Sequence, residues 1–337
     1  MKATSNKKPD SVSVVVPAYN AASFIERALD SVLGQTRRAD EIIVVDDGST
    51  DDTAEVLKQY EKQIRYIRQK NAGPGAARNR GIESAKGNWI AFLDADDEWM
   101  TKKLQSQVEL LQRNPELVWV SGNYLCCLCK QKRRAAVIEP KKIEQLLGRR
   151  EYHDSFFTAL RARASGCMDT MLIKKEVLQD AGLFPVNHFK SEDTDLWLRI
   201  AYLYPRIGFV REPMAIYHME VEASLARKRM EVDFAGDFIE RHLKLSSERG
   251  REKDFRPCAV GQVRALIRAS FFDDRVRNIR PFLRRFEDLL SYRYKLTVRL
   301  LTIFPQVTMR SCQMISRMVR TLGIRRRIFH PEEQKKK

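Results

Sequence analysis

The 337-residue chain lacks any run of about 18 uncharged apolar residues, so no segment is expected to cross a membrane as a helix. Lysines occur within residues 1–10, but no apolar core of signal-peptide length follows them. These absences predict a cytoplasmic protein. The six cysteines do not form two C-x-x-C motifs that could pair, which argues against a zinc site or a disulfide framework. No G-x-G-x-x-G sequence follows the first expected strand, which disfavours a dehydrogenase.

The composition is that of a globular protein with an uneven distribution of charge. Hydrophobic residues make up 43% and charged residues 31% of a chain long enough for one large or two unequal domains. Residues 229–337 contain 26 basic and 13 acidic residues, and so hold most of the formal net charge of +17. Such an excess of basic residues indicates an anionic partner. The candidates are nucleic acid, a phosphorylated substrate and an acidic membrane surface.

The first hundred residues alternate between two hydrophobic patterns. Continuous apolar runs, typical of buried parallel strands, predict strands at 12–16, 41–45, 64–67 and 89–93. Helical spacing or helix-start signals predict helices at 23–33, 49–60, 74–85 and 104–111. Ser49 to Asp52 fits a capping box, and Pro74 suits the first turn of its helix. The alternation predicts an α/β domain with a mostly parallel sheet.

The rest of the chain is less regular. We expect strand at 117–128 and 207–210, a strand followed by a helix at 170–178, helix at 191–202, and a short strand or loop at 213–218, while 130–165 shows no firm period. After about residue 229 the pattern becomes helical and basic, with breaks expected near Gly250, Pro257, Pro281 and Pro305.

Polar clusters follow the four expected strands at their carboxyl ends. They are Pro17-Ala18-Tyr19-Asn20, Asp46-Asp47-Gly48-Ser49, Asn71-Ala72-Gly73 and Asp94-Ala95-Asp96-Asp97. Ligands of open α/β sheets bind along this edge, so the clusters together predict a binding site.

The cluster at 94–97 places three carboxylates within four residues, where they repel one another unless a cation neutralises them. Hard oxygen ligands suit Mg²⁺ or Mn²⁺, which also bind phosphates. The alternative is that Asp96 or Asp97 caps the following helix.

The other candidate residues also admit two interpretations each. Asp46 or Asp47 either accepts hydrogen bonds from a nucleoside or forms a turn with Gly48. Tyr19 either stacks on a base or packs against the protein. Arg78 either contacts phosphate or orients an aspartate, or else it lies on the surface.

Acidic residues also open the helix expected at 191–202. Glu192 and Asp193 are either ordinary partners of the helix dipole or include a general base for an acceptor hydroxyl. His218, at a strand end, is either structural or completes a metal site.

Five motifs in this order resemble those of glycosyltransferase family 2. They are Pro17-Ala18-Tyr19-Asn20, Asp46-Asp47-Gly48-Ser49-Thr50-Asp51, Gly75-Ala76-Ala77-Arg78-Asn79, Asp94-Ala95-Asp96-Asp97 and Glu192-Asp193-x-x-Leu196-Trp197-Leu198-Arg199. The resemblance covers about residues 11–228. It implies a GT-A fold, which is a Rossmann-like, mostly parallel sheet with helices on both faces. It also implies inverting transfer of a sugar from a nucleotide-sugar, usually a UDP-sugar.

The same resemblance assigns roles to single residues. The nucleotide pocket would be lined by Pro17, Ala18, Tyr19, Asp47, Asn71 and Arg78, with Asp94 near the ribose or the metal. Asp96 would hold Mg²⁺ or Mn²⁺ on the diphosphate with His218 nearby, and Asp97 would border the donor sugar. Asp193 matches the family's catalytic base, and Glu192 lies beside it. Residues 219–225 depart from the family's His-x-x-Ser-x-Ser pattern, because only Ser224 is present.

The sequence therefore predicts a metal-dependent, inverting glycosyltransferase. It would move a hexose or N-acetylhexosamine to a hydroxyl of a saccharide acceptor, in the synthesis of lipopolysaccharide or a similar surface glycan. The alternatives are a nucleotide-sugar hydrolase and a non-catalytic nucleotide- or nucleic-acid-binding protein that keeps the fold. A glycoside hydrolase does not explain four nucleotide-type clusters.

We expect a tail at 1–10, a catalytic domain at 11–228 and a basic helical region at 229–337. Within the last region, residues 293–323 interleave apolar residues with arginine, which suits the surface of an anionic membrane on its cytoplasmic side. The alternative is that these helices pack on the catalytic domain and turn a basic face to solvent. No nucleic-acid-binding module is recognised, so nucleic acid is not the expected partner.

Overall fold

The computed structural model describes residues 10–128, 133–186, 191–219, 232–271 and 279–303. The chain divides into two compact units, Met1–Arg229 and Met230–Lys337. Within the described residues, no helix combines the length and the hydropathy that crossing a bilayer requires.

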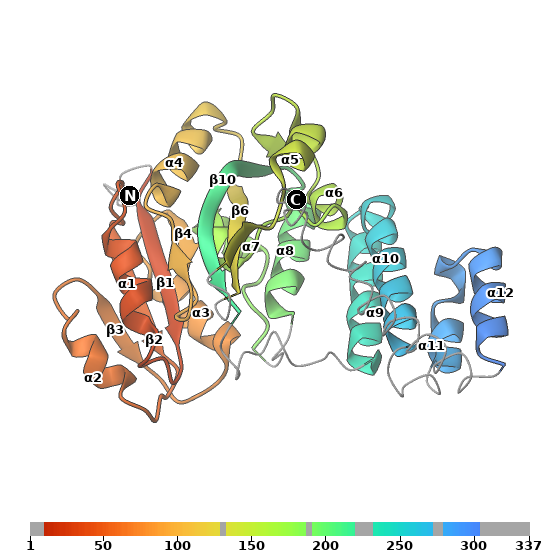
Figure 1. The fold of residues 1–337 in the computed structure, drawn as a ribbon, viewed down its shortest axis with the longest axis horizontal. Helices are drawn as coiled ribbons and strands as arrows, with labels where there is room; N and C mark the ends of the chain where they lie inside the picture. The colour runs from red at the N-terminus through yellow and green to blue at the C-terminus, as the bar shows by residue number, and fades with distance from the viewer. Residues whose placement is uncertain (1–9, 129–132, 187–190, 220–231, 272–278, 304–337) are drawn as a thin grey trace, which may run out of the picture. The chain divides into compact units, whose positions relative to one another are not determined.

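A ten-stranded mixed sheet forms the centre of the first unit (Figure 1). The strand order is β3-β2-β1-β4-β9-β6-β10-β5, with β7 paired to β6 and β8 to β10. The strands are β1 Val12–Ala18, β2 Glu41–Asp46, β3 Arg65–Arg68, β4 Trp89–Phe92, β5 Glu98–Trp99, β6 Trp119–Leu128, β7 Arg133–Ala136, β8 Tyr152–His153, β9 Leu172–Lys174 and β10 Ile207–His218. Strands β1 to β4 are parallel, which confirms the expectation for this part of the chain, and β9 lies antiparallel between β4 and β6.

Helices cover both faces of this sheet. They are α1 Ile25–Leu33, α2 Thr53–Lys58, α3 Pro74–Ser84, α4 Lys103–Arg113, α5 Pro140–Leu147, α6 Phe156–Arg161, α7 Lys175–Asp180 and α8 Glu192–Leu203, and Met168–Thr170 forms a 3₁₀ turn, η2. Val12, Val14 and Val16 share a core with α1 and α4, whereas α3 approaches Val15 on the opposite face. Because successive strand residues point to opposite faces, burial on both sides explains the continuous apolar run of β1.

Two expectations about helix ends were wrong. Helix α2 begins at Thr53, with no capping box at Ser49, because the Ser49 hydroxyl instead accepts the backbone N–H of Asn20 at 3.0 Å. In the second unit, α10 continues through Pro257, in the sixth position of that helix, rather than breaking there. Residues 213–218 belong to the long strand β10, which passes Pro213 with a shift of register.

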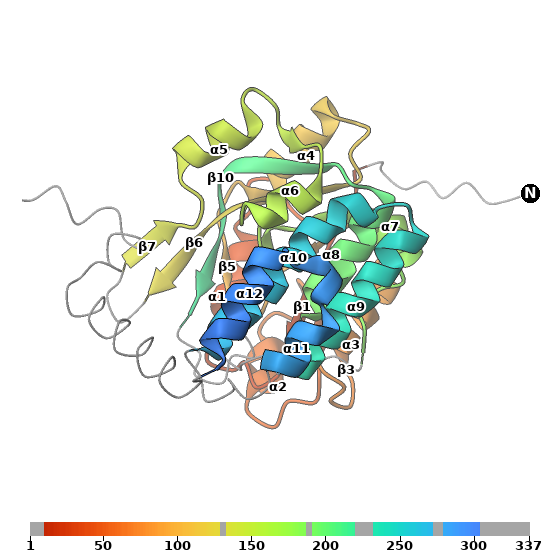
Figure 2. The same cartoon turned by 90° about the vertical axis from the view of Figure 1, so that its right-hand side faces the viewer.

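The second unit is helical, as expected (Figure 2). It contains α9 Val232–Glu248, α10 Glu252–Ser270, α11 Ile279–Arg285, the 3₁₀ turn η5 Glu287–Leu289 and α12 Tyr292–Leu301. Gly250 separates α9 from α10 with a positive φ of 66°, which confirms the predicted break. Pro281 lies in the first turn of α11 and does not end it. Pro305 lies outside the described residues.

Candidate functional site

The loops that follow β1, β2 and β3 are joined by hydrogen bonds at one edge of the sheet. The backbone N–H of Asn20 donates to Ser49 Oγ at 3.0 Å. The Asp47 carboxylate accepts the N–H groups of Ala72 at 3.0 Å and Gly73 at 2.8 Å. Gly73 has a φ of 89°, a conformation that favours glycine, so the chain can turn here into α3. The polar clusters expected at this edge do lie together.

The five candidate nucleotide residues of these loops differ in exposure. Tyr19 is 52% exposed and Asn71 is also exposed, so both side chains are accessible to a ligand. Pro17 is half-buried and Ala18 is buried. Asp47 is buried, and its carboxylate already holds the loop before α3. Their contacts with a nucleotide stay predictions.

Arg78 is a buried bridge rather than a surface arginine. Its guanidinium, on α3, donates to Asp94 Oδ1 at 2.7 Å and to Glu192 Oε1 at 3.0 Å. The Arg78 side chain is only 6% exposed. Burial alone would lower the pKa of Arg78, but Asp94 and Glu192 raise it above its ordinary value. One permanent cation therefore connects the acidic motif after β4 to the start of α8.

The start of α8 presents the two acidic residues that the sequence singled out. Ser191 has a left-handed φ of 59°, and the helix begins at the next residue. Burial raises the pKa of Glu192, although Arg78 acts in the opposite direction. Asp193 is half-buried, and its Oδ1 accepts the N–H of Thr194 at 2.6 Å. Its role as a base stays a prediction.

A fourth carboxylate, from elsewhere in the chain, joins the three of the motif after β4. Oxygen atoms of Asp94, Asp97 and Asp169 lie within 4.8 Å of one another. Asp97 Oδ1 accepts the N–H of His218 at 2.7 Å, whereas its buried Oδ2 accepts no hydrogen bond from an N–H or hydroxyl in the described part of the chain. Burial raises the pKa of Asp97 above its ordinary value, and the charge of Asp169 adds to the effect. Burial and the charge of Asp94 raise the pKa of Asp169, although its interaction with the Asp97 carboxyl acts in the opposite direction. An orphaned oxygen among three carboxylates fits a divalent cation.

Asp96 and His218, the two predicted metal ligands, do not belong to this group of three. Burial and the charge of Asp94 raise the pKa of Asp96 to about 6, and its backbone oxygen accepts the Arg27 guanidinium. His218 is 7% exposed, and its Nε2 lies 3.5 Å from Glu98 Oε2. Their metal role stays a prediction, as does contact between the buried Asp97 and a donor sugar.

Sequence reasoning missed Asp169 and Lys103. Asp169 lies in η2 and is 1% exposed, and Lys103 begins α4 with its side chain fully buried. Burial lowers the pKa of Lys103 to about 7, although the negative charge of Asp169 acts in the opposite direction. Neither residue belongs to a motif, so the sequence carries no signal that marks either one as buried.

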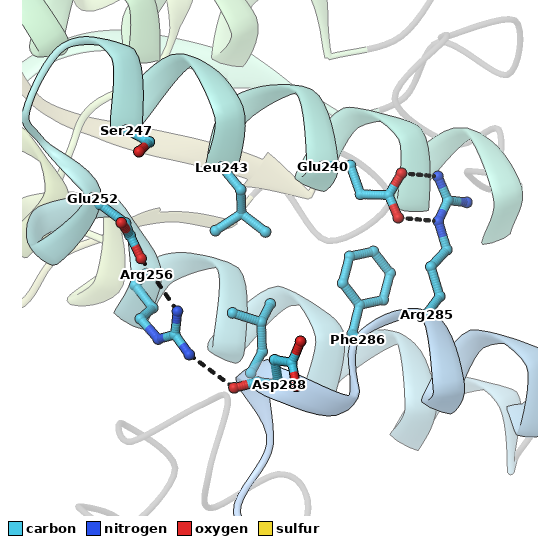
Figure 3. Close-up of a pocket in the computed structure, with 9 residues that line it drawn as sticks. Glu240, Leu243, Ser247, Glu252, Arg256, Arg285, Phe286 and Asp288 are labelled. Carbon is cyan, nitrogen blue, oxygen red and sulfur yellow. Dashed lines mark hydrogen bonds and ion pairs between the residues drawn. The ribbon is translucent and has the colours of Figure 1, made fainter.

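The second unit has a pocket of its own, with a volume of about 340 Å³ (Figure 3). Its charged groups pair with one another: Arg285 with Glu240 at 2.6 Å, and Arg256 with Glu252 at 3.3 Å. Because both arginines are paired within the unit, this pocket is a poor candidate for binding a diphosphate.

Comparison with known proteins decides the family. The model of "Glycosyl transferase family 2" matches residues 13–171. An uncharacterized glycosyltransferase of Haemophilus influenzae is 36% identical over 212 residues, which span 59% of this chain and 78% of that protein. The chain belongs to glycosyltransferase family 2.

The chain spans only part of the length of other relatives. It is 32% identical over 190 residues to the uncharacterized glycosyltransferase RP339 of Rickettsia prowazekii, a match that spans 56% of this chain and 58% of RP339. It is 45% identical over 105 residues to the putative teichuronic acid biosynthesis glycosyltransferase TuaG of Bacillus subtilis, spanning 30% of this chain and 41% of TuaG.

The fold is GT-A, as the sequence predicted. S. aureus TarS 1–349, solved in complex with UDP-GlcNAc, superposes with a TM-score of 0.62 at 16% identity, covering 93% of this chain and 92% of that one. Mannosyltransferase PcManGT from Pyrobaculum calidifontis, solved with GDP-Man and Mn²⁺, has a TM-score of 0.51 at 19% identity, covering 92% and 90%. At these identities the likeness establishes the fold alone.

Proposed function

We propose that this glycosyltransferase moves a hexose or N-acetylhexosamine, with inversion, from a UDP-sugar to a hydroxyl of a saccharide acceptor in the synthesis of a surface glycan. The observation that carries the proposal is the Arg78 bridge. It joins Asp94, at the expected nucleotide end, to Glu192, beside the expected base. The UDP-GlcNAc in TarS favours a UDP-sugar donor, and the name of TuaG favours an envelope glycan.

Asp193 is the proposed general base. In an inverting transfer the acceptor oxygen bonds to the anomeric carbon while the bond to the diphosphate breaks, and the hydroxyl proton passes to a carboxylate. Asp193 Oδ1 is held by the N–H of Thr194 at 2.6 Å, which fixes the rotation of the carboxylate. Its half-buried position at the start of α8 leaves it accessible to an acceptor.

Asp96 is the proposed ligand of Mg²⁺ or Mn²⁺, with His218 near it. When bound, the cation supplies charge neutralisation for the leaving diphosphate. The carboxylates of Asp94, Asp97 and Asp169 add negative potential at this point, which attracts a divalent cation. The Mn²⁺ solved with PcManGT supports the choice of a divalent cation.

Helix α12 is the proposed contact with an anionic membrane surface. Tyr292, Leu296 and Leu300 recur at every fourth position and are 74%, 45% and 57% exposed, whereas Val298 is buried. Arg293 and Arg299 belong to the same helix. An exposed apolar stripe beside cations favours the headgroup region of anionic lipid, where a lipid-linked acceptor would lie. Of the segment predicted to bind, 304–323 lies outside the described residues.

The experiment that tests the function uses the full chain with Mn²⁺, UDP-glucose, UDP-galactose or UDP-GlcNAc, and an envelope lipid extract. We expect one donor to give a labelled saccharide with a β-linkage, since these donors are α-linked. UDP release that does not depend on the extract would indicate a hydrolase instead. Binding of UDP without turnover of any donor would favour the non-catalytic alternative.

A further inference from the structure

Asp169 supplies the hydrogen-bond acceptor for a backbone N–H that no neighbouring strand pairs. The pairing of β4 with β9 ends at Ala91 and Leu172, so the backbone N–H of Asp94 lies beyond that ladder. Asp169 Oδ1 accepts this N–H at 2.9 Å. The contact fixes the backbone at the first residue of the acidic motif, and it does so from a point 75 residues further along the chain.

The turn that carries Asp169 is itself held firmly. The Thr170 hydroxyl donates to the Cys167 carbonyl at 2.8 Å, and Gln107 on α4 donates to the Thr170 carbonyl at 2.6 Å. Asp169 is 1% exposed, so water does not compete for its hydrogen bond. A rigid, dry acceptor of this kind can hold a neighbouring loop in one conformation.

We propose that Asp169 is a positioning residue for donor binding, which orients Asp94 toward Arg78. The contacts run from Asp169 to Asp94 at 2.9 Å, from Asp94 to Arg78 at 2.7 Å and from Arg78 to Glu192 at 3.0 Å. Loss of the first contact therefore disturbs the other two. The inference rests on the proposed function in one respect, since it takes Asp94 to lie at the donor site.

Two variants of Asp169 separate positioning from direct binding. Asp169→Asn keeps an oxygen that can accept the Asp94 N–H, whereas Asp169→Ala removes it. The probe is UDP with Mn²⁺, or GDP with Mn²⁺ if UDP does not bind the wild-type chain. We expect Asp169→Ala to weaken binding about tenfold or more and to raise the donor KM in parallel, and Asp169→Asn to stay within about threefold of wild type.

Asn123→Ala is the matched control for lost stability. Asn123 is 2% exposed, and its side chain donates to the Ile138 carbonyl and accepts the Ile138 N–H; within the described residues no hydrogen bond joins it to the acidic motif. It should lower Tm as Asp169→Ala does while leaving the affinity for UDP unchanged.

Two results would overturn the proposal. One is an Asp169→Ala variant that binds UDP as tightly as wild type. The other is an Asp169→Asn variant that binds as poorly as Asp169→Ala, which would make Asp169 a direct ligand of a cation. A wild-type chain that binds UDP but transfers no sugar would instead contradict the proposed function, and the binding comparison among these variants would still stand.

Discussion

The guanidinium of Arg78 donates to Glu192 at 3.0 Å, although 114 residues of sequence separate them. The same guanidinium donates to Asp94 at 2.7 Å. A single buried side chain on α3 thus holds together the loop after β4 and the start of α8, the two places where the chemistry is proposed to occur. Asp193 is adjacent to Glu192, so the position of the proposed base depends on this ion pair.

Arg78→Ala should cost both stability and activity. Removing one partner from a buried ion network leaves uncompensated charges, which typically destabilises a protein by about 3–5 kcal/mol. We expect a loss of that order in urea unfolding, together with a fall in kcat/KM of about a hundredfold or more. Arg78→Lys should recover little, because an ammonium group cannot donate along the two directions that the planar guanidinium serves.

The control for this change is Arg113→Ala. Arg113 pairs with Glu151 at 2.7 Å, but the two side chains are 55% and 37% exposed. Exposed pairs contribute about 0–1 kcal/mol, so the control should unfold almost as wild type does. If both variants lose the same small amount of stability, the Arg78 bridge does not stabilise the fold as predicted.

Asp193→Asn should leave donor binding intact and abolish transfer. The amide cannot accept the proton of the acceptor hydroxyl, but it keeps an oxygen that can accept the Thr194 N–H. The measurements are the affinity for UDP with Mn²⁺ and the rate of product formation. Asp180→Asn, an exposed carboxylate at the end of α7, should behave as wild type in both. Near-normal transfer by Asp193→Asn would exclude Asp193 as the base.

Asp96→Ala should weaken UDP binding chiefly when Mg²⁺ or Mn²⁺ is present. Its carboxylate is proposed to act through the cation, so in EDTA the variant and the wild-type chain should bind UDP equally weakly. Titration calorimetry in the two buffers gives the comparison. An equal loss of affinity with and without the cation would show that Asp96 is structural.

The stripe on α12 should govern binding to anionic vesicles. Replacing Tyr292, Leu296 and Leu300 by serine should reduce cosedimentation with phosphatidylglycerol-containing vesicles, since each is exposed and offers apolar surface to the interface. Val186→Ser, at a residue that is also 50% exposed but lies in the first unit, is the control. Equal sedimentation of the triple variant and wild type, or no dependence on lipid charge, would refute this surface.

The parts of this architecture that the sequence could predict are those with a local signal. The buried run at 12–16 and the polar residues after it are adjacent in sequence, and β1 and its loop appear where expected. The local sequence could not show that Ser49 forms no capping box, because the Ser49 hydroxyl accepts a hydrogen bond from Asn20 in another loop. A local sequence pattern predicts hydrogen bonds between residues close in sequence, whereas the donor to this hydroxyl lies 29 residues away.

The same reason explains the parts that were missed. Asp169 has no acidic neighbour in sequence, and its partner Asp94 lies 75 residues away. A strand followed by a helix was expected at 170–178, where β9 and α7 lie, but three residues are too few to indicate that β9 enters antiparallel between β4 and β6. The short elements within 130–165, such as α5 and α6, have six to eight residues each and are likewise stabilised by packing more than by pattern.

The measurement that tests the account most directly is the change in Tm of the full chain with UDP, GDP, CDP and dTDP, each with and without Mn²⁺. Binding to the folded state stabilises it by about 2.7 kcal/mol at a hundredfold excess over Kd. The account predicts that UDP raises Tm in the presence of Mn²⁺ and raises it much less in EDTA. The same small response to all four nucleotides, or no response to any of them with Mn²⁺, would contradict it.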